Sequence, residues 1–226
     1  CTYRDLHGSK FHYQWVHGTV AQNAVLVDGQ GQVKHSTAPH GRIADHRLAD
    51  KWDYVSGDAT DAYAGRLKRF RRNVVFVKPD VLVLYDDLEA AEPATFQFML
   101  HALAAFTVDE KNACASVDLP GAGVDIEYVA FRPLAFRQWD GFDPPPSAEF
   151  PNHWHLEAGT KEKAKTLGML TVLVPYRAGR RAAWTADSEE TATALGVRIT
   201  RGESSRLIAF RKHDAEGPAA IAGETF

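Results

Sequence analysis

Side chains that transfer protons or bind anions are concentrated near the start of the chain. Histidine and tyrosine are suited to proton transfer, and arginine and lysine to the binding of anionic groups. The cluster consists of Tyr3, Arg4, His7, Lys10, His12, Tyr13, Trp15 and His17. Composition alone leaves two interpretations open: a functional segment, or an irregular surface segment whose histidines are solvated or packed against neighbours.

A short strand and a turn follow this cluster. Residues 21–32 read AQNAVLVDGQGQ, in which Val25, Leu26 and Val27 precede the polar pair Asp28-Gly29. Branched apolar residues in front of Asp-Gly are typical of a strand that ends in a turn.

A hairpin over residues 73–87 is the clearest predicted element. Two runs rich in β-forming residues flank Lys78-Pro79-Asp80, which predicts a turn because Pro fixes φ and Asp can bond its own backbone. Both arms are almost continuously apolar, which indicates strands buried on both faces. Further strands are expected at 95–101, 124–129, 167–174, 196–200 and 206–210.

Repeated short strands without intervening helices predict an all-β fold, a large multi-stranded antiparallel β-sandwich with few or no helices. The 226 residues are 45% hydrophobic and 11% aromatic, enough for a substantial core. Residues 140–152, with three consecutive prolines, and residues 158–166 are predicted to be loops. Because core-like strands lie on both sides of the first loop, we expect one domain over residues 1–226.

Charge and cysteine content exclude several classes of function. The net charge of −3 and the lack of a recognisable binding module argue against nucleic acid as a partner. No apolar run approaches the roughly 18–20 residues that span a bilayer, so no membrane partner is expected. Cys1 and Cys114 make neither a disulfide framework nor a zinc site. Cys114 lies in an alternating strand pattern and is expected to be a small buried hydrophobe.

A basic run and three histidines in later strands carry alternative interpretations. The run is Arg66, Lys68, Arg69, Arg71 and Arg72. Its guanidinium groups could attract a polyuronate, or it could be a solvated strand face with one or two ion pairs to the segment Asp58–Asp61. We expect His101, at the end of an apolar strand, to be a satisfied core or sheet-end histidine.

Alternation along a strand would place His153 and His155 on one face and Trp154 on the other. Two histidines without a third ligand nearby do not favour a metal site. A sugar stacked on Trp154 or Trp139 is the rival interpretation. No Gly-rich phosphate loop, Gly-x-Ser-x-Gly elbow or zinc-hydrolase motif is present.

Several segments together resemble the heparinase II/III-like polysaccharide lyases, and most of all the oligo-alginate lyases. Residues 21–32 resemble the family signature AHNTVLVDGQGQ. Further matches, in family order, are 7–12 (family Tyr-Gly-Ser-x-His-His), 57–63 (GDAT.AY), 69–80 (RFRRxVLFLKPD), 85–90 with 96–102 (YDDLEA and FQWLLHA) and 152–156. The matches extend from about residue 1 to 175.

The resemblance implies the C-terminal β-sandwich of a longer lyase whose helical toroid domain is absent from this chain. Such lyases cleave acidic, uronate-containing oligosaccharides by β-elimination, here oligo-alginate, with heparin-type glycans as the alternative. The chief catalytic Tyr and His belong to the toroid, so no catalytic residue is assigned to this chain and the segment alone is expected to be inactive. A carbohydrate-binding module and a purely structural sandwich are the competing hypotheses.

The resemblance also implies that this segment forms one wall of the substrate cleft. The expected substrate-binding residues are His7, Lys10, His12, Tyr13, Trp15 and Gln22. Where family members hold a structural metal, a His at the position of Gln22 is a ligand, and a carboxamide is a poor replacement for imidazole. We therefore expect no metal and no cofactor, with Gln22 holding neighbouring backbone. The family suggests the bacterial cytoplasm or periplasm as the compartment.

Overall fold

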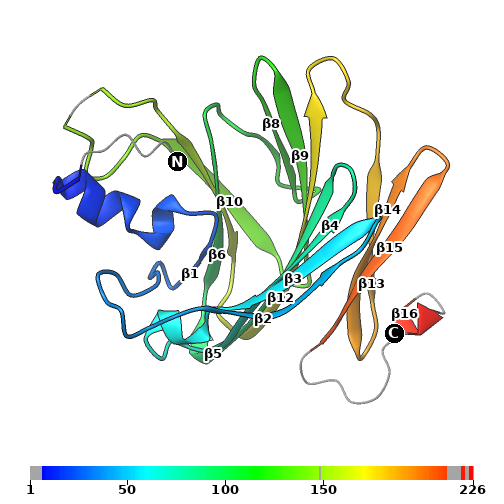
Figure 1. Cartoon of the computed structure of the whole chain (residues 1–226), viewed down its shortest axis with the longest axis horizontal. Helices are drawn as coiled ribbons and strands as arrows, with labels where there is room; N and C mark the ends of the chain where they lie inside the picture. The colour runs from blue at the N-terminus through cyan, green and yellow to red at the C-terminus, as the bar shows by residue number, and fades with distance from the viewer. Residues whose placement is uncertain (1–6, 148, 213–219, 222–223, 226) are drawn as a thin grey trace.

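The computed structural model describes residues 7–147, 149–212, 220–221 and 224–225, so the candidates Tyr3 and Arg4 lie outside the described residues. Most of the chain is strand, as expected for an all-β fold (Figure 1). The strands are β1 (Val25–Val27), β2 (Arg42–Leu48), β3 (Trp52–Asp58), β4 (Leu67–Val77), β5 (Val81–Ala94), β6 (Phe96–Ala102), β7 (Thr107–Asp109), β8 (Cys114–Asp118), β9 (Ala122–Ala130), β10 (Leu134–Asp140), β11 (Trp154–Thr160), β12 (Ala164–Arg177), β13 (Thr185–Glu190), β14 (Ala194–Arg201), β15 (Ser204–Arg211), β16 (Ala220–Ile221) and β17 (Glu224–Thr225).

The strands form antiparallel sheets arranged in three layers. A large sheet in the order β2-β3-β4-β5-β12-β9-β8-β7 lies in the middle. A four-stranded sheet, β1-β6-β11-β10, covers one of its faces, and a three-stranded sheet, β13-β14-β15, covers part of the other (Figure 1). The pair β16-β17 forms a separate two-stranded sheet, and β16 contacts β14.

The predicted hairpin is confirmed as β4 and β5, and the three layers explain its continuous apolar pattern. Phe70 and Leu88 face the four-stranded sheet and belong to the larger hydrophobic core. Val83 and Tyr85 face the three-stranded sheet and belong to the second core. This part of the middle layer is covered on both faces, so β4 and β5 lack the alternating pattern of a strand with one solvated face.

Two sequence expectations about details were wrong. Residues 158–166 are not one loop, because β11 continues to Thr160 and β12 begins at Ala164. Ala158 and Ala164 both pack in the larger core, which extends the strands into a polar sequence. Cys114 does begin a strand, but it is a free thiol of intermediate exposure rather than a buried hydrophobe.

In the part of the chain that the structure describes, helical structure is limited to three short segments. They are η1 (Phe11–Val16), η2 (Thr19–Ala21) and η3 (Thr60–Tyr63). Within the described residues, no helix is long and apolar enough to cross a membrane.

Candidate functional site

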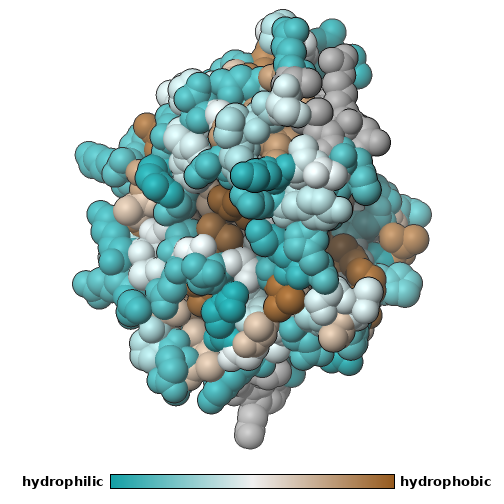
Figure 2. Space-filling model, turned by 90° about the vertical axis from the view of Figure 1, so that its left-hand side faces the viewer, coloured by the Kyte–Doolittle hydropathy of each residue, from teal (hydrophilic) through white to brown (hydrophobic). Residues whose placement is uncertain are grey.

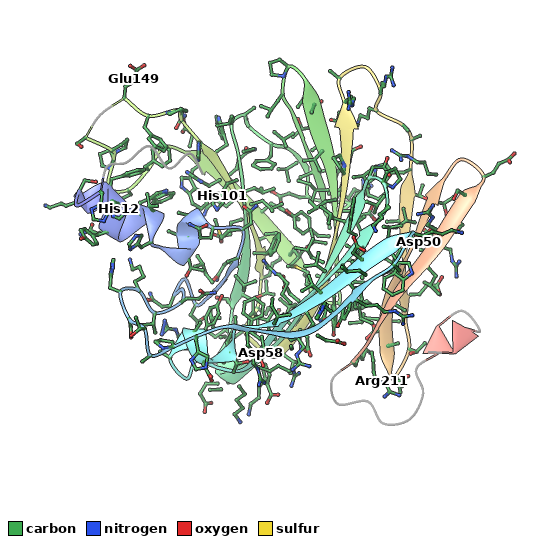
Figure 3. The ribbon with its side chains drawn as sticks, viewed as in Figure 1. His12, Asp50, Asp58, His101, Glu149 and Arg211 are labelled. Carbon is green, nitrogen blue, oxygen red and sulfur yellow. The ribbon has the colours of Figure 1, made fainter. Side chains whose placement is uncertain are left out.

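The helical segment η1 lies against the outer face of the four-stranded sheet and carries the clustered histidines (Figures 1 and 3). Its apolar residues Phe11 and Trp15 are 2% and 7% exposed. Phe11 contacts the rings of Phe142 and Phe150 in the long proline-containing loop, with centroids 5.3 Å apart in both cases. This satellite core anchors the segment to the sandwich and presents its polar face outward.

The segment η1 is a π-helix rather than an α-helix. The backbone N–H of His17 donates to His12 O at 3.2 Å, which is an i→i+5 bond. Ser9 precedes the helix, and its Oγ accepts a hydrogen bond from the N–H of His12 at 3.1 Å. Single turns of π-helix are frequent at functional sites.

Four histidines and a tyrosine form a connected group on this polar face, here called the His–Tyr cluster. Its members are His7, His12, Tyr13, His17 and His35. The ring of His12 lies 4.4 Å from that of His17 and 4.8 Å from that of His7, between centroids. The ring of His35 lies 5.0 Å from that of His17 and 5.2 Å from that of Tyr13.

The surroundings of His17 favour its neutral imidazole. Partial desolvation, followed by the charges of His12 and His35, lowers the pKa of His17. A neutral imidazole can accept a proton near neutral pH, which is the capacity that acid–base chemistry needs. Figure 2 views this side of the molecule, which is mostly hydrophilic with apolar side chains visible between polar ones.

The structure brings only part of the predicted substrate-binding set together. His7, His12 and Tyr13 belong to the His–Tyr cluster, and Lys10 is exposed at the start of η1. Trp15 lies on the opposite side of η1, where its ring is 4.9 Å from that of His155. Sequence reasoning missed His35, whose loop returns to η1 about twenty residues later in the chain.

Lys34 is a second residue that the sequence did not point to. Its Nζ donates to Gln14 O at 3.2 Å, next to the cluster. The loop that carries Lys34 and His35 follows the Asp-Gly turn. Only its return to η1 in three dimensions reveals the contact, and no periodicity or motif in the sequence would have indicated it.

Gln22 supports the backbone at the end of the helical segment. Its Nε2 donates to Val16 O at 3.1 Å, the kind of role expected from its amide. An exposed amide engaged in this way does not fit a metal site. Within the described part of the chain, no group of three or more His, Cys, Asp or Glu side chains is arranged to hold a metal ion.

The DGQGQ turn is built for packing. Asp28 Oδ1 accepts from the N–H of Thr95 at 2.9 Å and so ties the turn to the start of β6. A Cβ on Gly31 would lie 2.4 Å from Thr19 Oγ1, so only glycine allows this approach. The hydroxyl of Thr19 in turn accepts from the N–H of Gln32 at 2.7 Å. The signature motif therefore positions η2 and the cluster segment.

His101 and His155 form a pair beneath η1, in which His155 is buried and His101 is half-buried. Their Nδ1 atoms are 2.7 Å apart, and His155 Nε2 is 2.6 Å from Gly141 O. A carbonyl only accepts, so His155 Nε2 donates to Gly141 O, and by the same argument His101 Nε2 donates to Gln22 O at 3.1 Å. In the neutral pair each ring carries its one proton on Nε2, so the Nδ1–Nδ1 contact has no proton to share. Both Nε2 atoms have carbonyl partners, which agrees with the expected role of His101 as a satisfied core or sheet-end histidine.

The histidine pair should make the stability of the protein fall at mildly acidic pH. Burial lowers the pKa of His101 to about 4, against 6.5 for an unburied histidine, and burial also lowers the pKa of His155. Between about pH 6.5 and pH 4 the unfolded state binds more protons than the folded state. The neutral histidines therefore stabilise the folded state fully above about pH 6.5, and this stabilisation is lost as the pH falls towards 4. We expect a loss on the order of 2 kcal/mol between about pH 7 and pH 4.5.

Urea unfolding at both pH values checks this, with the His101→Gln variant showing a smaller loss. The comparison with the variant is needed because burial raises the pKa of Glu127 to about 6. A carboxyl group with a raised pKa makes the folded state more stable as the pH falls, which opposes the effect of the histidines. His40→Gln, on an exposed loop, is the matched control. Equal pH dependence in the wild type and in His101→Gln would contradict the assignment.

The alternation expected around Trp154 is confirmed. The rings of His153 and His155 lie 5.4 and 6.0 Å from that of Phe142 on the outer side of the sheet. Trp154 packs against the larger core on the other side and is only partly exposed. Trp139 is covered by Arg137, whose Cζ lies 4.6 Å from the ring centroid.

The basic run is mainly structural, with one ion pair to the expected segment and further ion pairs to β5 that the sequence did not indicate. Arg69 is bonded to Asp87 and Glu89, and Arg72 to Asp86, all on the neighbouring strand β5. Only Arg71 reaches the expected segment, with its Nη2 3.8 Å from Asp58 Oδ2. The register of β4 on β5 places these opposite charges side by side, which sequence separation alone did not indicate.

The comparison with protein families decides the identity of this fold. A model described as the C-terminal domain of heparinase II/III-like proteins matches residues 1–217. The chain belongs to the heparinase II/III-like family. This confirms the resemblance inferred from the motifs at the level of the family.

Solved structures of heparinases share the heparinase II/III-like fold of this chain. A heparinase III superposes with a TM-score of 0.70 at 10% identity, over 87% of this chain and 31% of that one. The heparan sulfate lyase HepC from Pedobacter heparinus gives 0.69 at 13% identity, over 89% of this chain and 32% of that one. The chain thus spans about a third of the length of these structures. No match was found among curated proteins.

Proposed function

We propose that this chain forms one wall of the substrate cleft in a lyase that cleaves uronate-containing glycans by β-elimination. The observation that carries the proposal is the His–Tyr cluster on η1, in a domain of the heparinase II/III-like family. The C5 proton of a uronate is weakly acidic, so its carboxylate must be neutralised, a base must remove the proton and an acid must protonate O4. Lys10 and the histidines supply cationic and proton-transferring groups for binding and orienting that carboxylate.

The base and acid themselves are proposed to lie in a helical toroid domain of the longer protein. This chain would then bind and orient the oligosaccharide without turning it over alone. The proposed substrates are heparan-type glycans and oligo-alginate. The names of the structural relatives favour the heparan type, whereas the motif resemblance favours alginate.

One assay distinguishes these possibilities. Full-length protein is incubated with oligomers of alginate and of heparan sulfate, and the ultraviolet absorbance of the 4,5-unsaturated uronate product is followed. A rise with one of them identifies the substrate class. No rise with any polyuronate, together with measurable binding, would point to a non-catalytic carbohydrate-binding domain and contradict the lyase proposal.

His12→Ala should reduce turnover of the full-length enzyme by roughly ten- to a hundredfold, because the loss of one positioning group is amplified in the rate. The melting temperature should change little, since the ring is partly exposed and its Nδ1 has no hydrogen-bond partner within the described residues. Steady-state kinetics and thermal unfolding check both expectations. His40→Ala, at an exposed histidine outside the His–Tyr cluster, is the control, and unchanged kinetics in His12→Ala would remove His12 from the cleft.

A further inference from the structure

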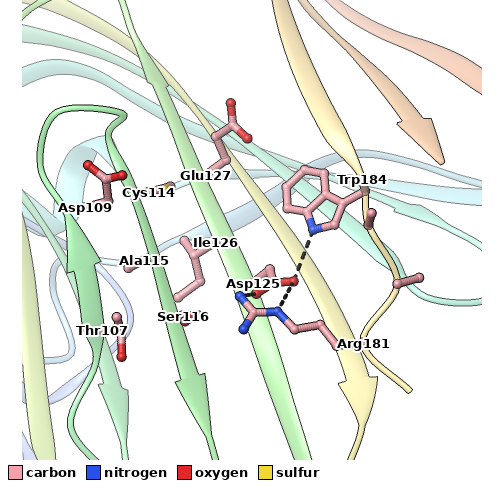
Figure 4. A pocket seen from close by; sticks show the side chains of 12 residues that line it. Thr107, Asp109, Cys114, Ala115, Ser116, Asp125, Ile126, Glu127, Arg181 and Trp184 are labelled. Atoms are coloured by element: carbon pink, nitrogen blue, oxygen red, sulfur yellow. Dashed lines mark hydrogen bonds and ion pairs between the residues drawn. The ribbon is translucent and has the colours of Figure 1, made fainter. Parts of the chain in front are cut away.

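Two grooves of opposite charge lie on either side of the three-stranded sheet, on the same face of the large sheet. In one, the carboxylates of Asp109, Asp125 and Glu127 lie opposite Arg181 and Trp184 (Figure 4). Arg181 and the indole N–H of Trp184 both bind Asp125, and the volume is about 540 Å³. The other groove, of about 1000 Å³, lies between strands β2–β4 and β15. We call it the basic groove.

Unpaired cations dominate the basic groove. Arg47, Lys51, Arg206 and Arg211 line it, against the single carboxylate of Asp45. None of these four cations forms an ion pair with any residue that the structure describes. Neighbouring cations are neutralised, since Lys78 binds Asp53 and Arg201 binds Asp80. Among the residues that the structure describes, the groove therefore carries a net positive charge.

Strand register directs these groups toward one another. Arg47 is paired with Tyr54, and Tyr54 with Val75, so their side chains share the face that the three-stranded sheet covers in part. The Cζ of Arg47 lies 5.2 Å from the ring centroid of Trp52. From the opposite wall, Arg206 Nη1 donates to Lys78 O at 3.3 Å.

Protection of strand edges is the alternative explanation for these charges. In the described sheets, β2 and β15 are edge strands, and charged residues on edges prevent pairing with other chains. Charges of either sign on either face would serve that purpose. Edge protection does not explain why the charges are almost all positive, or why they line a single groove together with Trp52 and Tyr54.

We propose that the basic groove is a second binding site for the acidic glycan, in which guanidinium and ammonium groups bind carboxylate or sulfate groups and Trp52 packs on a sugar ring with the face that Arg47 does not cover. Guanidinium matches such anions with two parallel hydrogen bonds, and an aromatic ring covers the apolar face of a sugar. The inference rests on the proposed function for the class of ligand. Figure 3 shows His12 and Arg211 at opposite ends of the molecule, so the groove would bind the glycan chain at a distance from the His–Tyr cluster.

The test compares two triple variants of the full-length protein that lose the same charge. Arg47→Gln/Lys51→Gln/Arg206→Gln removes the groove cations. Arg177→Gln/Arg180→Gln/Lys165→Gln removes two arginines and one lysine from exposed positions outside the groove. Dissociation constants for polymeric heparin and alginate are measured by calorimetry at several salt concentrations. The groove variant should bind the preferred polymer about tenfold more weakly, and the control less than about twofold.

Rates on polymer and on the shortest cleaved oligosaccharide separate this site from the cleft. The groove variant should lower the ratio of the polymer rate to the oligosaccharide rate, since only a long chain reaches both sites. Equally weakened polymer binding in the two triple variants would overturn the proposed groove site. So would unchanged polymer binding by the groove variant together with a lower melting temperature. If only the groove variant lost polymer binding and the wild type formed no unsaturated product, the groove site would be supported and only the lyase proposal would be contradicted.

Discussion

Asp86→Ala should lower the free energy of unfolding by about 3–5 kcal/mol, the usual cost of leaving a buried charge without its partner. The Asp86 side chain is 1% exposed and receives two hydrogen bonds from Arg72, at 2.6 and 2.8 Å. Arg72 lies between the two main sheets, and its Nη1 also donates to Asn23 O at 2.6 Å. Without Asp86 the guanidinium would remain buried with one carbonyl as its partner. Urea unfolding of the purified chain measures the loss.

The double variant Arg72→Met/Asp86→Leu tests the physical cause. Replacing both members of a buried pair with apolar side chains of similar volume is often nearly neutral. We therefore expect the double variant to be more stable than Asp86→Ala. Arg42→Met is the matched control on an exposed pair, whose contribution should be at most about 1 kcal/mol. A double variant as unstable as Asp86→Ala would show that packing at this position, and not the isolated charge, determines the loss.

Tyr63→Ala should cost about 3–5 kcal/mol, the range for removing a large buried aromatic side chain. Tyr63 is 0% exposed, and its ring lies 5.4 Å from that of Phe70. Its hydroxyl donates to Val25 O at 2.6 Å, and burial raises its pKa to about 12, so it remains a neutral donor. The variant would therefore lose core packing and the link between η3 and β1.

Tyr63→Phe separates these two contributions. It keeps the ring and removes one hydrogen bond, so we expect a loss of about 1 kcal/mol in urea unfolding. Tyr13→Ala, at a tyrosine 43% exposed, should change stability by less than about 0.5 kcal/mol. If Tyr63→Phe were as destabilising as Tyr63→Ala, the bond to Val25 would account for most of the effect.

The strands could be predicted from sequence because their signals are local. The turn at Lys78-Pro79-Asp80 and the apolar arms on both sides gave the β4–β5 hairpin, and the run before Asp28-Gly29 gave β1. The end of β11 and the start of β12 were missed, because residues 158–166 are polar in composition. Their strand structure depends on pairing and on the burial of Ala158 and Ala164 in the core.

The candidate site could be predicted only in part. The density of histidine and tyrosine near the start of the chain indicated His7, His12 and Tyr13, and these three do lie together. It also suggested Trp15, which the turn of the helix directs towards the interior. His35 and Lys34 were missed because they reach the cluster through a returning loop, and sequence separation carries no signal for such a contact.

By itself, the sequence determined the all-β class, the hairpin and the heparinase II/III-like family, since periodicity, turn residues and motif order are properties of neighbouring residues. Only the tertiary structure decided which charges pair and which remain free. Arg72 is neutralised by Asp86 because the register of β4 on β5 places them side by side, whereas Arg47 and Arg206 face an open groove. Charge pairing depends on which strands are neighbours, and that order arises from the packing of the three layers.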